Sequence, residues 1–127
     1  MFEKLELTRM AQALAAHSGA RMAVIARNVA NADTPGFKAQ DLRPFAKVFA
    51  EDGDAMRTSR PGHMAGHGAD APMQNQRAPG REAPNGNTVS LEGEMVKSVE
   101  VRQSHEMALA VYRATSDVIR ASLGRSR

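Results

Sequence analysis

Cysteine and tryptophan are absent from this chain of 127 residues, which contains one Tyr and four Phe. Without cysteine the chain forms no disulfide, holds no metal through thiolates and offers no cysteine nucleophile. Aromatic residues are few, and Ala and Met make up much of the hydrophobic share. We therefore expect that the single chain does not form a strong hydrophobic core of its own. The composition therefore predicts helices that bury their faces against other chains.

Long uninterrupted apolar runs are also missing. The most apolar stretches are broken by His17, Arg21 and Arg27, so we expect no transmembrane segment. Glu3 and Glu6 lie where a secretory leader needs a basic segment. We therefore expect that a chain leaving the cytoplasm does so without a cleaved signal peptide.

Two long helices are predicted from the spacing of apolar residues by three and four positions. We expect an N-terminal helix within residues 1–33, packed through Leu14, Met22, Ile25 and Val29. A C-terminal helix and a basic tail are expected within residues 90–127. Its packing residues form two neighbouring stripes that include Val99, Met107, Leu109 and Val118.

The connecting region divides into two parts. Residues 34–50 are expected to hold a turn and a short helix that starts near Asp41–Pro44. Residues 51–89 alternate Gly and Pro without apolar periodicity, which predicts a flexible or extended segment. The expected fold is all-α and elongated, with the terminal helices paired as an antiparallel hairpin or coiled coil within a helical assembly and an irregular Gly/Pro-rich middle.

The chain contains few residues that suggest a metal site or an active site. His63, Met64, His67 and Asp70 have metal-binding side chains, but the surrounding glycines do not hold a helix that would align the rings. The glutamates of the C-terminal helix have no apparent catalytic partners and are expected on a solvated face. We therefore predict no enzyme, no cofactor, no metal site and no small-molecule substrate.

The formal charge of +3 leaves one alternative open. A small basic helical protein can bind nucleic acid when its cations cluster. The best candidates here are Arg113, Arg120, Arg125 and Arg127. These residues equally complement the C-terminal end of a helix dipole and favour solubility, so we expect no nucleic-acid partner.

The most specific pattern lies where the first helix ends. Asn28 and Asn31 share one helix face, and an amide there either caps the helix or fixes the register of packed helices. Thr34 precedes a proline, which disfavours helical backbone. Pro35 and Gly36 suit the central positions of a type II turn, and Phe37 follows. We expect these six residues to form an assembly motif.

Residues 25–39 resemble the signature of the bacterial flagellar basal-body rod family, in the form carried by proximal rod subunits. Residues 85–92 resemble the segment that leads into the C-terminal helix of those subunits, whereas residues 51–84 match nothing useful. The resemblance implies a structural subunit of the periplasmic rod that transmits torque and joins the membrane-ring base to the distal rod. Its terminal helices would order only on assembly.

The implied partners are other rod subunits of the FlgC, FlgF and FlgG types, the rod adapter FliE, the membrane ring, the flagellar type III export gate and copies of the chain itself. Export substrates of this class resemble one another in a Phe-x-x-x-hydrophobic motif. Phe45 and Phe49 fit that motif. They are equally well explained as two aromatic anchors of a short helix.

Overall fold

The computed structural model describes residues 2–53, 75–78 and 80–124. The elements in chain order are α1 (Phe2–Ala30), β1 (Gln40–Leu42), α2 (Phe45–Gly53), β2 (Asn75–Arg77) and α3 (Leu91–Ser122). The protein is mostly helical, with long N- and C-terminal helices as the sequence predicts. At about 1.5 Å per residue, the 32 residues of α3 extend roughly 48 Å.

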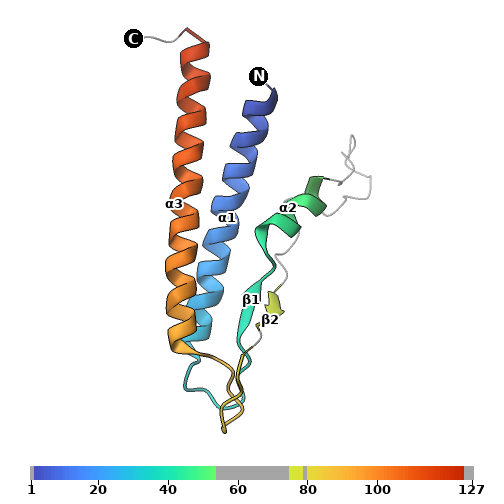
Figure 1. Ribbon diagram of the computed structural model, residues 1–127, viewed down its shortest axis with the longest axis vertical. Helices are drawn as coiled ribbons and strands as arrows, with labels where there is room; N and C mark the ends of the chain where they lie inside the picture. The colour runs from blue at the N-terminus through green and yellow to red at the C-terminus, as the bar shows by residue number, and fades with distance from the viewer. Residues whose placement is uncertain (1, 54–74, 79, 125–127) are drawn as a thin grey trace, which may run out of the picture.

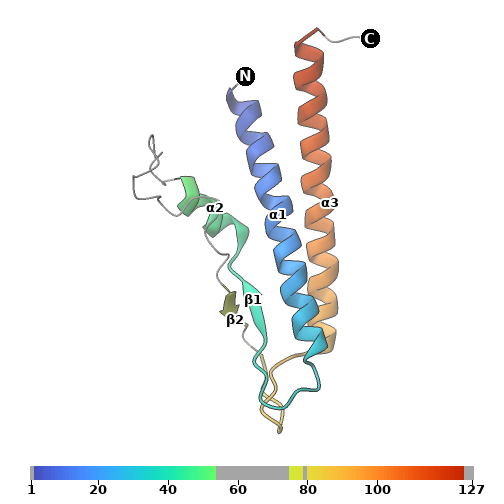
Figure 2. The same cartoon turned by 180° about the vertical axis from the view of Figure 1, so that it is seen from behind.

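Helix α1 is the central element of the structure. Helices α1 and α3 lie side by side and run in opposite directions, so the two chain termini lie at the same end (Figure 1). Strands β1 and β2 and helix α2 lie on the other side of α1, which the view from behind also shows (Figure 2). No helix among the described residues is both long enough and apolar enough to cross a membrane.

The contact between α1 and α3 follows a seven-residue repeat. Residues seven apart return to the same face of a helix when two helices pack along a shared seam. The buried residues at this spacing are Ala11, Ser18 and Ile25 on α1, and Glu94, Val101 and Ala108 on α3. The seam is therefore built mainly from small and polar side chains, with few large apolar ones.

The ends of α3 follow from local sequence signals. Ser90 is the N-cap, and its Oγ accepts a hydrogen bond of 3.3 Å from the Gly93 N–H. Glu92 and Glu94 in the first turn carry the charge that the helix N-terminus favours. The helix stops before Gly124, which has a φ of +69°.

The short helix expected to follow Asp41–Pro44, over residues 45–50, is present as α2, and N–H groups of its first turn donate to the Pro44 carbonyl. Asp41 and Leu42 are not part of the helix start. Residues 40–42 form strand β1, which pairs antiparallel with β2 so that Asp41 lies opposite Gln76. Tertiary hydrogen bonds to the backbone of Gln40 select this extended conformation over a helix. Helix α2 begins only at Phe45, after Pro44.

The segment expected to lack regular structure contributes to two elements. Helix α2 continues to Gly53, and strand β2 covers residues 75–77 within that segment. β2 is short and consists of three exposed polar residues, so apolar periodicity gave no indication of it.

Candidate functional site

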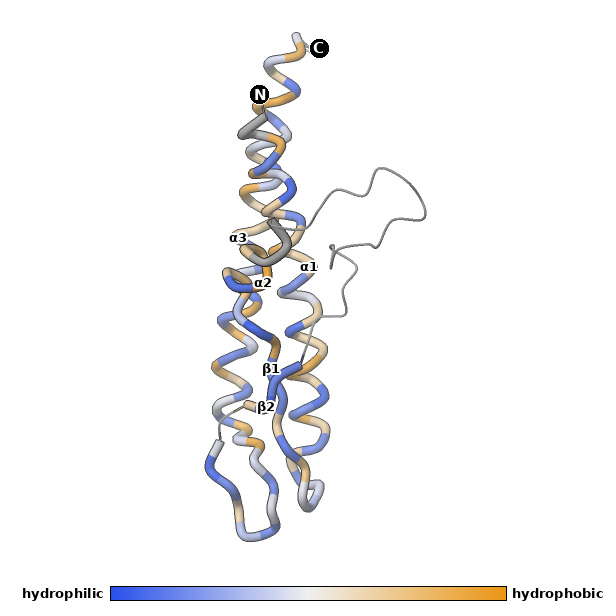
Figure 3. The backbone as a smooth tube through the Cα atoms, turned by 90° about the vertical axis from the view of Figure 1, so that its right-hand side faces the viewer, coloured by the Kyte–Doolittle hydropathy of each residue, from blue (hydrophilic) through white to orange (hydrophobic). Residues whose placement is uncertain are grey.

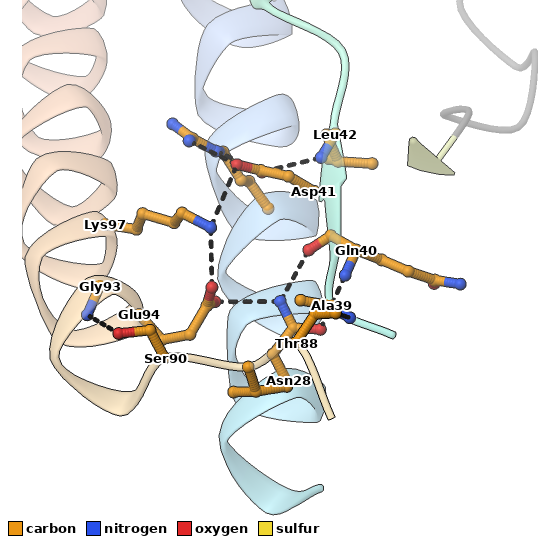
Figure 4. A network of polar contacts seen from close by, with 12 residues as sticks. Asn28, Ala39, Gln40, Asp41, Leu42, Thr88, Ser90, Gly93, Glu94 and Lys97 are labelled. Atoms are coloured by element: carbon orange, nitrogen blue, oxygen red, sulfur yellow. Dashed lines mark hydrogen bonds and ion pairs between the residues drawn. The ribbon is translucent and has the colours of Figure 1, made fainter. Parts of the chain in front are cut away.

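Two polar clusters lie where α1 ends and α3 begins, and Asn28 is the centre of the first (Figure 4). Its side chain is 1 % exposed. The Asn28 Oδ1 accepts a hydrogen bond of 3.1 Å from the Gln40 N–H, and Nδ2 donates to the Gln40 carbonyl at 2.7 Å. Nδ2 also donates to Glu94 Oε2 at 3.0 Å. One amide therefore joins α1, β1 and α3.

Glu94 extends this cluster through a chain of charges. It is 2 % exposed, and Lys97 Nζ lies 2.7 Å from its Oε1. Lys97 Nζ also lies 3.9 Å from a carboxylate oxygen of Asp41. Asp41 in turn accepts two hydrogen bonds from the Arg21 guanidinium, at 2.7 and 2.8 Å. The buried carboxylate of Glu94 is thus paired, as a buried charge must be.

The charges around Asp41 determine its ionisation. Burial disfavours its charged form, but the hydrogen bond and charge of Arg21, with the Leu42 N–H and Lys97, outweigh burial. The pKa of Asp41 is therefore lowered below its ordinary value of 3.8. The hydrogen bond to Asp41 raises the pKa of Arg21 in turn, against the opposing effect of burial. Both groups stay charged at neutral pH.

Asn87 forms the second cluster. Its Nδ2 donates to the backbone carbonyls of Asn31, Ala32 and Thr34 at 3.0, 2.8 and 2.9 Å. Its Oδ1 accepts a hydrogen bond of 2.7 Å from the Val89 N–H. The last carbonyls of a helix have no partner within the helix. A single buried amide here binds three carbonyls at and beyond the end of α1, an arrangement that we call the Asn87 clamp.

The turn after α1 has the predicted geometry. Gly36 has a φ of +73°, and the Phe37 N–H donates to the Thr34 carbonyl at 3.3 Å, as a type II turn requires. The Gly36 N–H donates to the Asn85 carbonyl at 2.9 Å, and the Thr88 N–H donates to the Phe37 carbonyl at 3.1 Å. The turn is therefore held from outside by the segment that precedes α3.

The two segments that carry the family resemblance, residues 25–39 and 85–92, thus bind each other. Lys38 Nζ donates to the Gly86 carbonyl at 2.8 Å, and the Ala39 N–H donates to Thr88 Oγ1 at 2.9 Å. Among the described contacts of the Asn31 side chain, Nδ2 donates locally to the Arg27 carbonyl at 2.8 Å. Of the two predicted asparagines, Asn28 joins elements through its side chain, whereas the Asn31 amide acts locally.

Sequence reasoning missed several members of these clusters, Glu94, Gln40 and Asn87 among them. Glu94 was expected on a solvated face and is buried, because its carboxylate meets the Asn28 amide. Its seven-residue spacing from Val101 and Ala108 is a signal that could have placed it in the seam. Gln40 contributes its backbone, which no side-chain pattern reveals. Asn87 was identified only as part of residues 85–92, the segment that resembles the approach to the C-terminal helix of rod subunits.

Phe45 and Phe49 lie together on α2. Their ring centroids are 5.3 Å apart, and the Phe45 ring meets the His17 ring edge-on at 5.6 Å. His17 Nε2 lies 2.8 Å from the Arg43 carbonyl. Phe45 also lines a cleft of about 310 Å³, together with Leu14, among others. In the folded chain this aromatic pair is half-buried against α1.

The predicted packing residues divide between the seam and the surface. Ile25 is buried in the seam, and Leu14, Met22 and Leu109 are half-buried. The other four are exposed on the single chain: Val29, Val99, Met107 and Val118. The reason is that α3 turns Glu94, Val101 and Ala108 toward α1.

No group of three or more acidic or histidine side chains is placed to hold a metal within residues 2–53, 75–78 and 80–124. The metal candidates His63, Met64, His67 and Asp70 lie outside the described residues, as do Arg125 and Arg127. Arg120 lies 3.7 Å from Asp117 in an exposed ion pair.

The chain is similar in sequence to flagellar rod proteins. Residues 10–38 match the model of a family described as flagella basal body rod protein. The flagellar basal body rod protein FlgB of Agrobacterium fabrum is 28 % identical over 114 residues, covering 83 % of each chain. The flagellar basal body rod protein FlgB of Salmonella typhimurium is 28 % identical over 101 residues, covering 72 % of this chain and 73 % of that relative.

Proposed function

We infer that this chain is a FlgB-like structural subunit of the flagellar basal-body rod, and not an enzyme. The family model covers the end of α1 and the turn, where Asn28 and the carbonyls bound by the Asn87 clamp lie. The family match and both relatives are rod proteins, which favours this interpretation over nucleic-acid binding.

One observation about the fold carries the proposal: many large apolar side chains of the two long helices are exposed outside the seam. The exposed large apolar residues of the two long helices are Leu5, Leu7, Met10, Val29, Leu91, Met95, Val96, Val99, Met107, Val111, Tyr112 and Val118. Figure 3 shows hydrophobic segments along both helices from end to end. A hairpin with small and polar residues inside and large apolar residues outside buries its apolar surface against other chains.

The outer face of α3 is the clearest example. Each residue advances the direction of a helix side chain by about 100°. Val99 therefore lies on the side of α3 opposite Val101 and Ala108, and Met107 lies about 100° or more round the helix from both. Val99 and Met107 are 67 % and 56 % exposed. We propose that this face, with Val96 and Val118 at its two ends, packs against neighbouring subunits of a helical assembly.

The finer assignments follow from the FlgB-like character. The subunit occupies the proximal, periplasmic part of the rod, joins the membrane-ring base to the distal rod and transmits torque. Its neighbours are copies of itself, rod subunits of the FlgC, FlgF and FlgG types and the adapter FliE. It reaches the rod through the type III export gate without a cleaved signal peptide. What supports these proposals is the FlgB resemblance together with the outward apolar faces.

A pair of substitutions on the outer face tests the assembly proposal. Val99→Asp and Met107→Asp place a charge on the proposed interface without touching the α1–α3 seam. We expect co-purification with the other rod subunits and motility to be lost, while the circular dichroism of the chain alone stays unchanged. Gln76→Glu adds a charge on exposed β2 and is the matched control. Normal motility of both α3 variants would refute the interface.

The export role of Phe45 and Phe49 has its own test. We propose that the pair docks at the export gate, which requires α2 to leave the position that it holds against His17. Replacing both Phe with Ala should abolish secretion of the chain. Lys47→Ala changes an exposed residue between them and should leave secretion intact. Unchanged secretion of the double variant would remove the export role and leave the rod function standing.

A further inference from the structure

The turn that holds the end of α1 contains a chemically reactive pair, Asn85–Gly86. Five asparagines occur in the chain, and Asn85 is the one followed by glycine. Glycine lacks a side chain, so its backbone nitrogen approaches the preceding side chain without steric hindrance. We propose that Asn85 is a site of spontaneous deamidation and that the folded turn suppresses the reaction. The proposal is independent of the function in the rod.

The reaction needs water and no other reagent. The Gly86 backbone nitrogen loses its proton and attacks the side-chain carbonyl carbon of Asn85. A new C–N bond closes a five-membered succinimide ring, and the side-chain nitrogen leaves as ammonia with the protons that it needs. Water then adds to one of the two ring carbonyls. Opening of the ring yields aspartate or isoaspartate at position 85.

Glycine at position 86 is required by the fold. Gly86 has a φ of +80°, which side chains of L-residues rarely tolerate. A Cβ at this position would also lie 3.4 Å from the Gly36 Cα. The positive φ of Gly86 therefore favours a reactive sequence, because the residue that allows the turn also leaves Asn85 open to attack.

Hydrogen bonds within the same turn suppress the reaction in the folded chain. The Gly86 N–H donates to the Ala83 carbonyl at 2.8 Å, so a base cannot take its proton until that bond opens. Asn85 Oδ1 accepts a hydrogen bond of 3.1 Å from the Asn87 N–H, which fixes the side chain. The Asn85 carbonyl is bound by the Gly36 N–H at 2.9 Å. Asn85 itself is exposed, so protection comes from these bonds and not from exclusion of water.

The two products differ in their consequences for the Asn87 clamp. Aspartate at position 85 keeps an oxygen that accepts the Asn87 N–H, so the turn survives. Isoaspartate routes the backbone through the side chain and inserts an extra methylene before Gly86. That insertion displaces Asn87 from the carbonyls of Asn31, Ala32 and Thr34. Isoaspartate therefore opens the end of α1, whereas Asn85→Asp does not.

The experiment compares ageing of the folded and the unfolded chain. Native protein is incubated at mildly alkaline pH with and without guanidinium chloride, and each sample is digested with trypsin. Cleavage after Arg81 and Lys97 releases the peptide of residues 82–97. Mass spectrometry with fragmentation then measures acid at position 85 against Asn87, which lies in the same peptide and precedes Thr88.

We expect modification at Asn85 alone, slower in the folded chain on the order of tenfold or more, because opening of the turn must precede attack. Asn85→Ser keeps an oxygen acceptor for the Asn87 N–H and should abolish the reaction without loss of helicity. Equal rates in the two solvents would overturn the protection. An unmodified Asn85 in guanidinium chloride would overturn the site itself.

Discussion

Asn28→Asp is the sharpest test of the polar cluster, because it exchanges one nitrogen for one oxygen at nearly constant volume. In the native chain, Asn28 Nδ2 donates to the Gln40 carbonyl at 2.7 Å and to Glu94 Oε2 at 3.0 Å. The aspartate cannot donate either bond at neutral pH. It also brings a second negative charge to within about 3 Å of Glu94, at a position that is 1 % exposed.

The expected loss of stability is large for so small a change. Glu94 keeps Lys97 as a partner, but the new carboxylate at position 28 is a buried charge without a partner of its own, which typically costs about 3–5 kcal/mol. Asn28→Ala removes the same donors without adding a charge, and should cost about 1–3 kcal/mol for the groups left unpaired. The aspartate variant should therefore be less stable than the alanine variant, although aspartate is closer in shape to asparagine.

Urea unfolding followed by far-UV circular dichroism measures these differences. Asn31→Asp is the matched control, since it makes the same exchange three residues along at a half-buried amide with a local contact. Its cost should stay at about 0.3–1 kcal/mol, the effect of a negative charge near a helix C-terminus.

Acidification supplies a second signature. On acidification the aspartate introduced at position 28 takes up a proton and becomes a donor, so the difference between Asn28→Asp and the native chain should shrink. If Asn28→Asp costs no more than Asn31→Asp, and its effect does not change with pH, the buried contact between Asn28 and Glu94 is refuted.

Four further substitutions test the surrounding geometry. Asn87→Ala removes a donor from three carbonyls, of which those of Asn31 and Thr34 keep a bond from a backbone N–H, and should lower the free energy of unfolding by about 1–3 kcal/mol in the same urea assay. The pKa of Asp41 is lowered by Arg21, so this ion pair stabilises the fold above pH 3.8. Acid titration of stability should show the contribution fall as the pH drops through the lowered pKa. Asp41→Asn should remove this part of the pH dependence. The Cβ of Gly36→Ala meets no atom within 4 Å and that of Gly86→Ala meets the Gly36 Cα at 3.4 Å, an ordinary contact, so each should cost only the roughly 1–2 kcal/mol of left-handed backbone.

Each of these results has a contrary outcome. An unchanged unfolding midpoint for Asn87→Ala would mean that the clamp does not form in solution. Identical acid titrations of the native chain and Asp41→Asn would remove the ion pair with Arg21 from the account of stability. A clearly larger cost at Gly86 than at Gly36 would mean that the added Cβ does not fit beside Gly36.

The long helices could be predicted from the sequence because apolar spacing and capping residues act locally. The pattern around Leu14 and Ile25 gave α1, and Ser90 gave the start of α3. Pro35 and Gly36 gave the turn, since a fixed φ followed by a residue that tolerates positive φ leaves few alternatives. The family resemblance also came from contiguous residues, at 25–39 and 85–92.

The short strands could not be predicted in this way. Asp41 reads as a helix start, yet it lies in β1 because Asn28 and Arg21 bind the strand from a neighbouring helix. The role of Asn87 depends on carbonyls more than fifty positions earlier in the chain. Contacts over such separations depend on how the chain returns on itself, and a single sequence does not carry that information.

The sequence by itself determined two long amphipathic helices, the turn after the first, and the resemblance to rod proteins, because each of these depends on neighbouring residues. Only the tertiary structure decided which helix faces meet. It placed Glu94, Val101 and Ala108 toward α1 and left Val99 and Met107 outside. The physical reason is that a helix with apolar residues on several sides packs in more than one way. The buried bonds of Asn28 and Asn87 favour the arrangement observed.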